Sequence, residues 1–356
     1  MRVLTVINSL VLAGAERLVF DLVPRLEERG VEITLAILQA VDSPLERELR
    51  AHGVRFLPVA GGGVYSPRQI VHLARNAVGH HLVHAHLFPA QFWTALAALR
   101  WSPPLPLVIT EHGTTNLRRR WWFRPVERWM YSRYDRIFCN SDATARSLIA
   151  WVPGVTARTT VVPNGIDLAR FTRSPRSHES RERYVLTFIA RLDSLKDHDT
   201  LFRAMTYVPN ADLQLVGVGP REPTLRRLAA ELRVSDRVQF LGHRTDVPEL
   251  LQATDIYVHC SHSDGFGIAV AEAMAAGCAV VSTRNEGLED VVGDAGFLVP
   301  PGDFHSLAGA LRRLLASSEE RQRLGALAQR QVQQFSIEAT ADEYVRQYRE
   351  VLAAAT

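Results

Sequence analysis

The sequence predicts an α/β protein made of two doubly wound parallel sheets. Short β-branched runs alternate with amphipathic helical stretches through most of the 356 residues. Such alternation produces parallel strands whose two faces are both covered by helices. The pattern breaks once, in a polar and charged segment at residues 172–183, and then restarts. We therefore expect two domains of similar size, which a chain of this length can support.

The expected domains are residues 1–171 and 184–335, joined by the linker 172–183. A C-terminal helix within residues 336–356 is expected to pack back on the first domain. The candidate strands are RVLTVI, VEITLAIL, LVHAH, PLVIT and RIFCN in the first domain, and YVLTFIA, LQLVG, VQFLG, DIYVH, AVVST and GFLVP in the second. Most are bounded by Gly, Pro or polar residues, as buried strands are. Amphipathic stretches such as AERLVFDLVPRLEERG and PTLRRLAAELRV predict the helices between them.

The composition indicates a cytoplasmic protein. No run of about 18 apolar residues is present, so no membrane-spanning helix is expected. The start MRVLTVINSL lacks the features of a secretory signal and is typical of a first strand. Cys139, Cys260 and Cys278 are widely spaced and form neither a disulfide framework nor a zinc pattern.

Charge is distributed unevenly along the chain. Residues 1–180 carry 22 Lys and Arg against 14 Asp and Glu, whereas residues 181–356 carry 19 against 24. A basic front half favours an anionic partner such as a lipid surface or a phosphate-bearing acceptor. An arginine-rich solvated surface explains the same asymmetry. No nucleic-acid-binding motif accompanies the charge, so nucleic acid is not an expected partner.

Lys196 is the most informative residue, because it is the only lysine in the protein. Arginine fills every other basic position, so a compact and rotatable ammonium was kept where a planar guanidinium would not serve equally. Lys196 follows the strand YVLTFIA, and Arg191 stands at the carboxyl end of that strand. Ligands of doubly wound sheets bind outside such strand ends. We expect both side chains to hold a diphosphate.

A second segment, SHSDGFGIAVAEAMAAGCAVVS, predicts a loop followed by a small apolar helix. Asp264 lies in the loop, and the helix is expected from about Gly267 to Ala276. Its first N–H groups offer an anion site. Glu272 stands in the second turn and leans back toward the N-terminus, so it can reach the same site and accept hydrogen bonds from a sugar diol.

Two features of the first domain complete the candidates. Gly14 lies in a turn at the start of the first long helix, where a phosphate can approach, but the turn lacks the G-x-G-x-x-G pattern of dinucleotide binding. His84 and His86 share one face of LVHAH, and His112 follows the next strand. We expect His112 to contact a sugar or acceptor; core histidines are the alternative. No known metal-ligand spacing is present, so no metal is expected.

The segment Arg118–Trp129 is basic and aromatic at helical spacing. Such a helix could lie on a membrane surface. A helix that packs its aromatic residues inward has the same pattern.

Together these segments resemble family 4 of the retaining glycosyltransferases, over nearly the whole chain. The matching fragments, in order, are AGAERL, HAH, TEHG, VPNGID, ARLDSLK, LVGVGP, FLGHRTDV, SDGFGIAVAEAMAAG and GDAGFLVPPGD. Any single fragment of this kind can arise by chance, whereas the whole series in this order does not. The resemblance implies the GT-B fold, in which two Rossmann-like domains face each other across a cleft.

The resemblance implies that Arg191 and Lys196 bind the diphosphate of the donor and that Glu272 holds its ribose. Asp264 stands at the first acid of the family's motif of two glutamates separated by seven residues. That acid contacts the donor sugar, assisted by backbone N–H groups around Phe266-Gly267-Ile268. Aspartate here is a departure from the usual glutamate and shortens the reach by one methylene, which puts the identity of the sugar in doubt.

The resemblance also implies that Gly14 lies against the diphosphate and that His112 touches the transferred sugar. His243 and Arg244 stand where the family places its nucleobase pocket, formed largely by backbone. Ala13 replaces the first of two usual glycines, which restricts that loop slightly.

The implied activity is transfer of a sugar from a nucleoside diphosphate to a glycan or lipid-linked acceptor, with retention of configuration and without metal or other cofactor. Such an enzyme would work in the cytoplasm or at the inner face of the membrane, in cell-surface polysaccharide synthesis. Two alternatives stay open. One is a sugar-nucleotide epimerase, and the other is a partner subunit that kept the fold and lost catalysis.

Overall fold

The computed structural model describes residues 1–11, 13–114, 119–171 and 183–355. The chain divides into two compact units, the first made of Met1–Ile166 with Phe335–Thr356 and the second of Asp167–Gln334. The first unit thus ends a little earlier than residue 171. The expected linker, residues 172–183, lies outside the described residues except for its last position.

The first unit is a parallel sheet with strand order β3-β2-β1-β4-β5-β6-β7. The strands are β1 Arg2–Ile7, β2 Glu32–Ile37, β3 Arg55–Phe56, β4 Leu82–His86, β5 Leu107–Glu111, β6 Arg136–Cys139 and β7 Thr159–Val161. The helices are α1 Gly14–Glu28, α2 Pro44–Ala51, α3 Arg68–Asn76, α4 Ala90–Ala98, α5 Arg124–Ser132, α6 Asp142–Trp151, the 3-10 helix η1 Pro153–Arg158 and the C-terminal α14 Ile337–Ala355.

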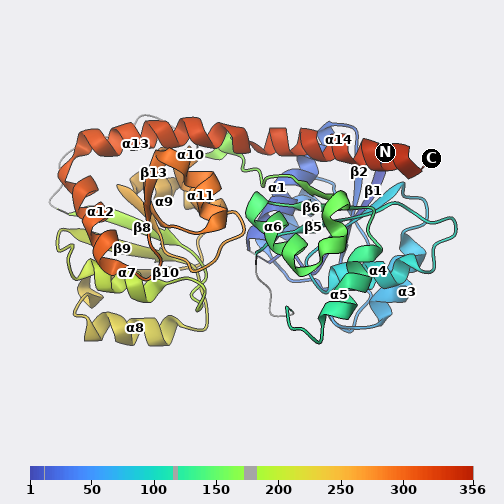
Figure 1. The fold of residues 1–356 in the computed structure, drawn as a ribbon, viewed down its shortest axis with the longest axis horizontal. Coiled ribbons are helices and arrows are strands. Elements are labelled where there is room, and N and C mark those ends of the chain that lie inside the picture. Colours follow the sequence, from blue (N-terminus) through green and yellow to red (C-terminus); the bar gives the residue numbers. More distant parts are fainter. Residues whose placement is uncertain (12, 115–118, 172–182, 356) are drawn as a thin grey trace. The chain divides into compact units, whose positions relative to one another are not determined.

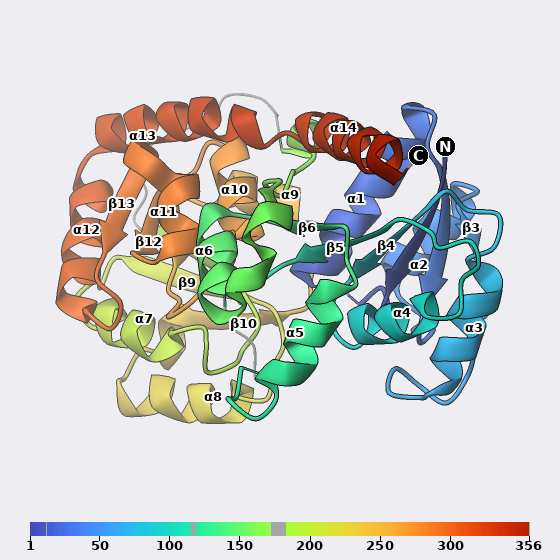
Figure 2. The same cartoon turned by 45° about the vertical axis from the view of Figure 1, so that its right-hand side comes forward.

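Strand β1 is buried on both faces. Val3 and Ile7 join a core cluster with α1, α2 and α14, whereas Leu4 and Val6 join a second cluster with α3 to α6. This double burial is what a doubly wound sheet requires of its central strand. Helix α14 lies along α1 (Figures 1 and 2), and Arg29, the residue that caps the end of α1, pairs with Asp342 of α14 at 2.6 Å.

The second unit is a parallel sheet with strand order β10-β9-β8-β11-β12-β13. The strands are β8 Tyr184–Ile189, β9 Ala211–Val216, β10 Val238–Gly242, β11 Ile256–His259, β12 Ala279–Thr283 and β13 Gly296–Val299. The helices are α7 His198–Met205, α8 Glu222–Glu231, α9 Val247–Ala253, α10 Ile268–Ala275, α11 Glu286–Val292, α12 Phe304–Ala316 and α13 Ser318–Gln331, with 3-10 helices η2 Leu168–Arg170, η3 Ser235–Arg237, η4 Gly293–Ala295 and η5 Val332–Phe335.

The strand order reverses once in each sheet. In the first sheet the chain proceeds outward from β1 on one side and from β4 on the other; in the second sheet β8 and β11 are the two neighbours. Open parallel sheets bind ligands outside the carboxyl ends of the strands at such a reversal. The loops after β1 and β4, and those after β8 and β11, are therefore where the fold itself places a site.

The eleven strands expected from the sequence are confirmed, with ends that differ by at most two residues. Two short edge strands, β3 and β7, were not expected. Strand β3 has two residues and β7 has three, too few for alternation to be visible in a sequence. Two parallel-sheet halves, each covered by helices, confirm the expected fold class.

The segment Arg118–Trp129 does not form one helix, which corrects that expectation. Its first residue lies outside the described residues, Trp121 and Trp122 lie in a turn, and α5 begins only at Arg124. Pro125 lacks an N–H and suits the first turn of a helix, which favours a start at this point. Trp121 is 84% exposed and Trp122 is 57% exposed.

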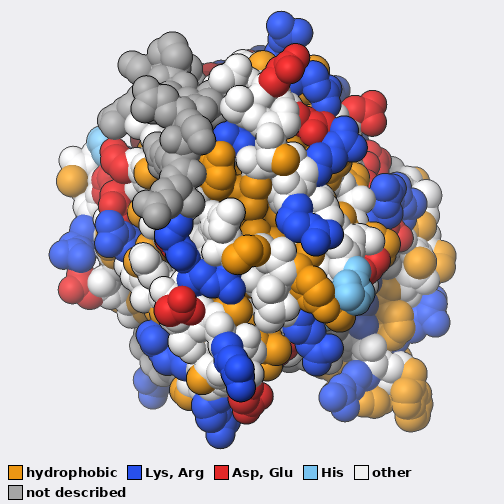
Figure 3. Space-filling model, turned by 90° about the vertical axis from the view of Figure 1, so that its left-hand side faces the viewer, with side chains coloured by type: hydrophobic (Ala, Val, Ile, Leu, Met, Phe, Trp, Pro, Cys, Tyr) orange, Lys and Arg blue, Asp and Glu red, His pale blue; other side chains and the backbone are white. Residues whose placement is uncertain are grey.

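The face of the molecule drawn in Figure 3 carries arginine side chains scattered among acidic and apolar ones. Interspersed charge of this kind is typical of a solvated surface.

A buried hydrogen-bond network ties α14 to β4 and β5. His84 Nδ1 lies 2.6 Å from the hydroxyl of Tyr348, and His84 Nε2 lies 2.8 Å from the hydroxyl of Thr110. The Thr110 hydroxyl in turn lies 3.0 Å from that of Tyr344. Burial lowers the pKa of His84 to about 3, so its imidazole is neutral. His84 is thus a hydrogen-bonded core histidine that fastens the last helix.

Replacing Tyr348 by Phe should lower the free energy of unfolding of the first unit by about 1–3 kcal/mol, because a buried ring nitrogen of His84 loses its partner. All six tryptophans lie within residues 93–151, so urea unfolding followed by tryptophan fluorescence reports on this unit. The matched control is Tyr65→Phe, at a side chain that is 72% exposed, where no change is expected. Equal effects of the two variants would contradict the role given to Tyr348.

Candidate active site

The loops after β8 and β11 are joined by backbone hydrogen bonds at the reversal point of the second sheet. The N–H of Asp197 donates to the carbonyl of Cys260 at 3.0 Å, and the N–H of His262 donates to the carbonyl of Leu195 at 2.9 Å. Lys196 forms an isolated antiparallel bridge with Ser261 between these bonds. A residue of the first loop is thereby held beside residues of the second, although 65 positions separate Lys196 from Ser261 in the chain.

This junction brings Lys196 and Asp264 into direct contact. The Lys196 ammonium forms an ion pair with Oδ1 of Asp264, and their side chains are only 17% and 13% exposed. Oδ2 of Asp264 accepts a hydrogen bond from Nε2 of His259 at 3.0 Å. Burial alone would raise the pKa of the Asp264 carboxyl, but His259 and Lys196 outweigh it and hold that pKa well below its ordinary value. Asp264 is therefore ionised at neutral pH.

His259 was not among the residues selected from the sequence. It ends β11 within the apolar run DIYVH, where a histidine has no local signal that separates a site residue from a core residue. The structure shows it 2% exposed, with Nδ1 3.3 Å from the hydroxyl of Tyr257. Only the pairing of two distant loops reveals that its other nitrogen faces Asp264.

Helix α10 begins beside this group. Its N-cap is Gly267, with φ of 84°, and Phe266 before it is buried. Ile268 is its first residue, and Glu272 lies one turn further on. Glu272 is close enough to Tyr257 that its charge, added to burial, raises the pKa of the Tyr257 hydroxyl. The structure thus places both Glu272 and Asp264 near the hydroxyl of Tyr257.

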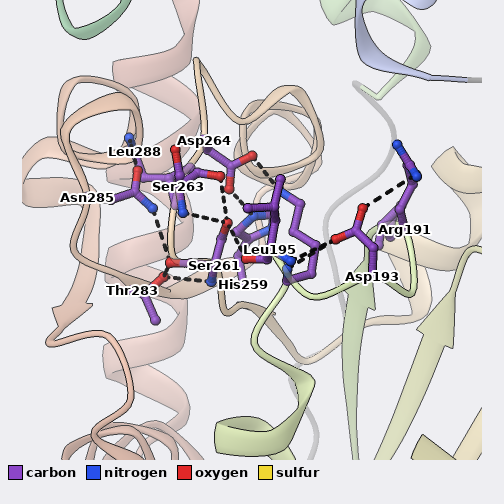
Figure 4. A network of polar contacts seen from close by, with 12 residues as sticks. Arg191, Asp193, Leu195, His259, Ser261, Ser263, Asp264, Thr283, Asn285 and Leu288 are labelled. Carbon is purple, nitrogen blue, oxygen red and sulfur yellow. Dashed lines mark hydrogen bonds and ion pairs between the residues drawn. The ribbon is translucent and has the colours of Figure 1, made fainter. Parts of the chain in front are cut away.

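Arg191 is on the same loop as Lys196 but pairs elsewhere. Its Nε lies 3.5 Å from Oδ2 of Asp193, and its side chain is 69% exposed. Oδ1 of Asp193 accepts hydrogen bonds from the backbone N–H groups of Leu195 and Lys196 at 3.0 and 3.3 Å. Figure 4 shows Arg191 beside Asp193 and apart from the group around Asp264. Asp193 therefore shapes the loop, and Arg191 does not contact the ion pair.

His243 and Arg244 follow β10 at the edge of the same sheet. Both residues are exposed, and the guanidinium of Arg244 pairs with Asp246 at 2.5 Å. They lie beyond the carboxyl end of β10, two strands away from the reversal point.

The reversal point of the first sheet carries a second polar group. Asn8, after β1, donates to the carbonyl of Phe88 at 2.8 Å and accepts from the N–H of Ala90 at 3.0 Å, which joins the loops after β1 and β4. At the end of β4, Nδ1 of His86 lies 3.1 Å from Nε2 of His112. Gly14 is exposed at the start of α1.

His112 is held through its backbone, and one of its ring nitrogens is buried. The Asn140 side chain donates to its carbonyl at 3.0 Å, which fixes the loop after β5. Burial lowers the pKa of His112 to about 4, so the ring is neutral at pH 7. Its Nδ1 has no hydrogen-bond partner among the described residues.

In the part of the chain that the structure describes, no group of three or more His, Cys, Asp or Glu side chains is arranged to hold a metal ion. Two of the histidines at these strand ends bond to other side chains. His84 bonds to two hydroxyls, and His86 bonds to His112.

Family models match both halves of the chain. The family described as Glycosyl transferases group 1 matches residues 170–331, and Glycosyltransferase Family 4 matches residues 12–170. The chain is 32% identical over 321 residues to a D-inositol 3-phosphate glycosyltransferase of Salinispora arenicola, covering 79% of this chain and 71% of that protein. It is 27% identical over 342 residues to the lipopolysaccharide core biosynthesis glycosyltransferase LpsE of Rhizobium meliloti, covering 94% and 95%.

A solved structure has the same fold. The crystal structure of Anabaena Alr3699/HepE in complex with UDP-glucose superposes with a TM-score of 0.87, covers 98% of this chain and 100% of that chain, and is 23% identical in sequence. This likeness confirms the GT-B fold class that the sequence motifs implied.

Gly287, in α11, determines how closely the Asp264 loop can approach. A Cβ at Gly287 would lie 2.2 Å from the backbone oxygen of Asp264, so Gly287→Ala should displace that loop and destabilise the second unit by about 1–3 kcal/mol. Gly309, inside α12, is the matched control because a Cβ there meets nothing within 4 Å. Gly309→Ala should instead stabilise by about 0.5–1 kcal/mol.

Urea unfolding followed by circular dichroism measures both glycine variants, since residues 167–334 contain no tryptophan. A neutral Gly287→Ala would show that the Asp264 loop is not held by this approach.

Proposed function

Because the chain belongs to the glycosyltransferases of group 1 and family 4, we propose that it moves a sugar from a nucleoside diphosphate to an acceptor hydroxyl with retention of anomeric configuration. The family models together span residues 12–331, and the whole fold is of the GT-B type.

One observation carries the assignment of the donor site: the only lysine of the chain is ion-paired with a buried aspartate at the reversal point of the second sheet. The ammonium has three N–H donors, so Lys196 can contact Asp264 and still donate to a diphosphate. The Asp264 carboxylate has about four lone-pair positions and accepts two bonds from protein, which leaves capacity for a sugar hydroxyl.

In the proposed reaction the bond between the anomeric carbon and the diphosphate oxygen breaks, and a bond to the acceptor oxygen forms on the same face. The acceptor proton passes to the departing phosphate. Negative charge grows on the diphosphate as positive charge grows on the sugar ring. Lys196 and the N-terminus of α10 would stabilise the former, and the exposed Arg191 side chain can turn toward it. Protein cations would thus take the place of a metal.

A uridine diphosphate sugar is the first donor to test. The solved structure with the same fold was obtained with UDP-glucose, and the two relatives are named for an inositol phosphate acceptor and for lipopolysaccharide core synthesis. We propose that the acceptor is a phosphate-bearing or lipid-linked glycan precursor, and that Glu272 binds the ribose of the donor while His112 contacts the transferred sugar.

We also propose that the first unit touches an anionic membrane surface through Trp121 and Trp122, at the inner face of the membrane. Both indoles are largely exposed, and the exposed Arg120 and Arg128 stand nearby in the sequence. Exposed aromatic residues with flanking cations are typical of proteins that lie at a lipid interface. None of the helices among the described residues has the length and apolar run needed to span a bilayer.

Lys196→Arg and Glu272→Gln should each lower the turnover of UDP-glucose at least ten-fold, or ~1.4 kcal/mol of transition-state stabilisation. Lys196→Arg keeps the positive charge but loses the compact ammonium. Glu272→Gln loses the negative carboxylate that accepts hydrogen bonds from the ribose hydroxyls. Steady-state release of UDP measures both. Glu222→Gln, at an exposed surface pair with Arg226, is the control and should stay at the wild-type rate. Near-normal turnover in both site variants would remove the assignment.

The double variant Trp121→Ala/Trp122→Ala should reduce sedimentation with phosphatidylglycerol-containing vesicles at least three-fold. The apolar area that enters the interface is lost while the arginines remain. Tyr65→Ala, at another exposed aromatic residue, is the control and should bind like the wild type. If the double variant binds as well as the control, the membrane contact does not involve this turn.

A further inference from the structure

The group around Asp264 contains a residue with no assigned part in the reaction. His259 is buried at the end of β11 and donates to the carboxylate oxygen that Lys196 does not contact. This inference rests on the proposed function, since it concerns how the donor site is held.

The proton positions within the group follow from its partners. Burial lowers the pKa of His259 even though Asp264 alone would raise it, so the imidazole is neutral at pH 7 and carries one N–H. That proton is on Nε2, because the atom facing Nε2 is a carboxylate oxygen that can only accept. Nδ1 is therefore unprotonated, and it lies 3.3 Å from the hydroxyl of Tyr257, which also donates to the carbonyl of Ile189 at 3.4 Å.

The two bonds to Asp264 come from different elements. Lys196, on the loop after β8, contacts Oδ1, and His259, on β11, contacts Oδ2. With both oxygens engaged, the carboxylate cannot rotate about its terminal bond without losing a charge-assisted hydrogen bond. His259 itself is rigid, since it is 2% exposed and packs edge-on against Phe188 with ring centroids 5.2 Å apart.

A second buried histidine of this unit shows what a purely structural role looks like. Nδ1 of His198 lies 2.8 Å from the backbone carbonyl of Lys196, and its Nε2 has no partner among the described residues. His198 supports the loop through the backbone alone. His259 instead donates its single N–H to the carboxylate of Asp264, which belongs to the proposed donor site.

We propose that His259 is a positioning residue: its Nε2–H fixes the carboxylate of Asp264 in the orientation that meets the donor sugar.

The test compares His259→Leu, His259→Gln and the control His262→Leu in the full chain. Leucine removes the donor, whereas the amide nitrogen of glutamine reaches the position of Nε2 and can replace it. His262 is on the same loop, but its ring is 52% exposed and lies 3.7 Å from Asp197. Turnover of UDP-glucose and the dissociation constant of UDP, which lacks the transferred sugar, are measured for each protein.

We expect His259→Leu to lower turnover at least ten-fold while the affinity for UDP changes by less than about three-fold. His259→Gln should return turnover to within about three-fold of the wild type, and His262→Leu should match the wild type. A general packing defect would not be rescued by glutamine and would not spare UDP. If His259→Leu does not fold, His259→Asn takes its place: the shorter amide does not reach Asp264, so turnover should again fall at least ten-fold.

Three results would overturn the inference. Wild-type turnover in His259→Leu would show that His259 has no positioning role, while leaving the proposed function intact. Equal losses of turnover in His259→Leu and His259→Gln would show that His259 contributes only through packing. A wild-type protein that neither binds UDP nor turns over UDP-glucose would overturn the proposed donor and this inference together.

Discussion

The ion pair between Lys196 and Asp264 is the interaction on which the site depends. A partly buried pair is held only if its other polar atoms are also satisfied, and removing one partner leaves a charge that the protein must desolvate alone. Here the backbone bonds between the loops after β8 and β11 bring the charges together, and His259 satisfies the second carboxylate oxygen. Sheet topology, loop pairing and side-chain chemistry thus converge on one point, the reversal of strand order in the second sheet.

Close backbone approach is the second constraint. Gly287 lets α11 meet the backbone of the Asp264 loop, and Gly267 adopts the left-handed conformation at the start of α10 where a Cβ would lie 2.3 Å from Leu288. Gly217 and Gly219 similarly allow the loop after β9 to approach Ala190 and Leu192. These glycines allow the backbone to pack closely around the loop that carries Lys196.

Much of this could be predicted from the sequence, for identifiable reasons. Strands such as RVLTVI are buried on both faces and read as continuous apolar runs, and the rarity of lysine singled out Lys196. Features that depend on distant pairing could not be predicted: the contact of Lys196 with Asp264, the diversion of Arg191 to Asp193, and the part of His259 hidden in an apolar strand. The aromatic spacing of Arg118–Trp129 predicted one helix, whereas Pro125 favours a helix that begins only at Arg124 and leaves Trp121 in a turn.

The single lysine makes the central claim directly measurable. Protein labelled with carbon-13 at the ε position of lysine gives one lysine signal in an NMR spectrum, that of Lys196. If the ion pair lies at the donor diphosphate, titration with UDP-glucose should shift this signal in a saturable manner, with the same dissociation constant that calorimetry gives. A signal that stays in place while calorimetry shows the nucleotide sugar bound would contradict the assignment of the site.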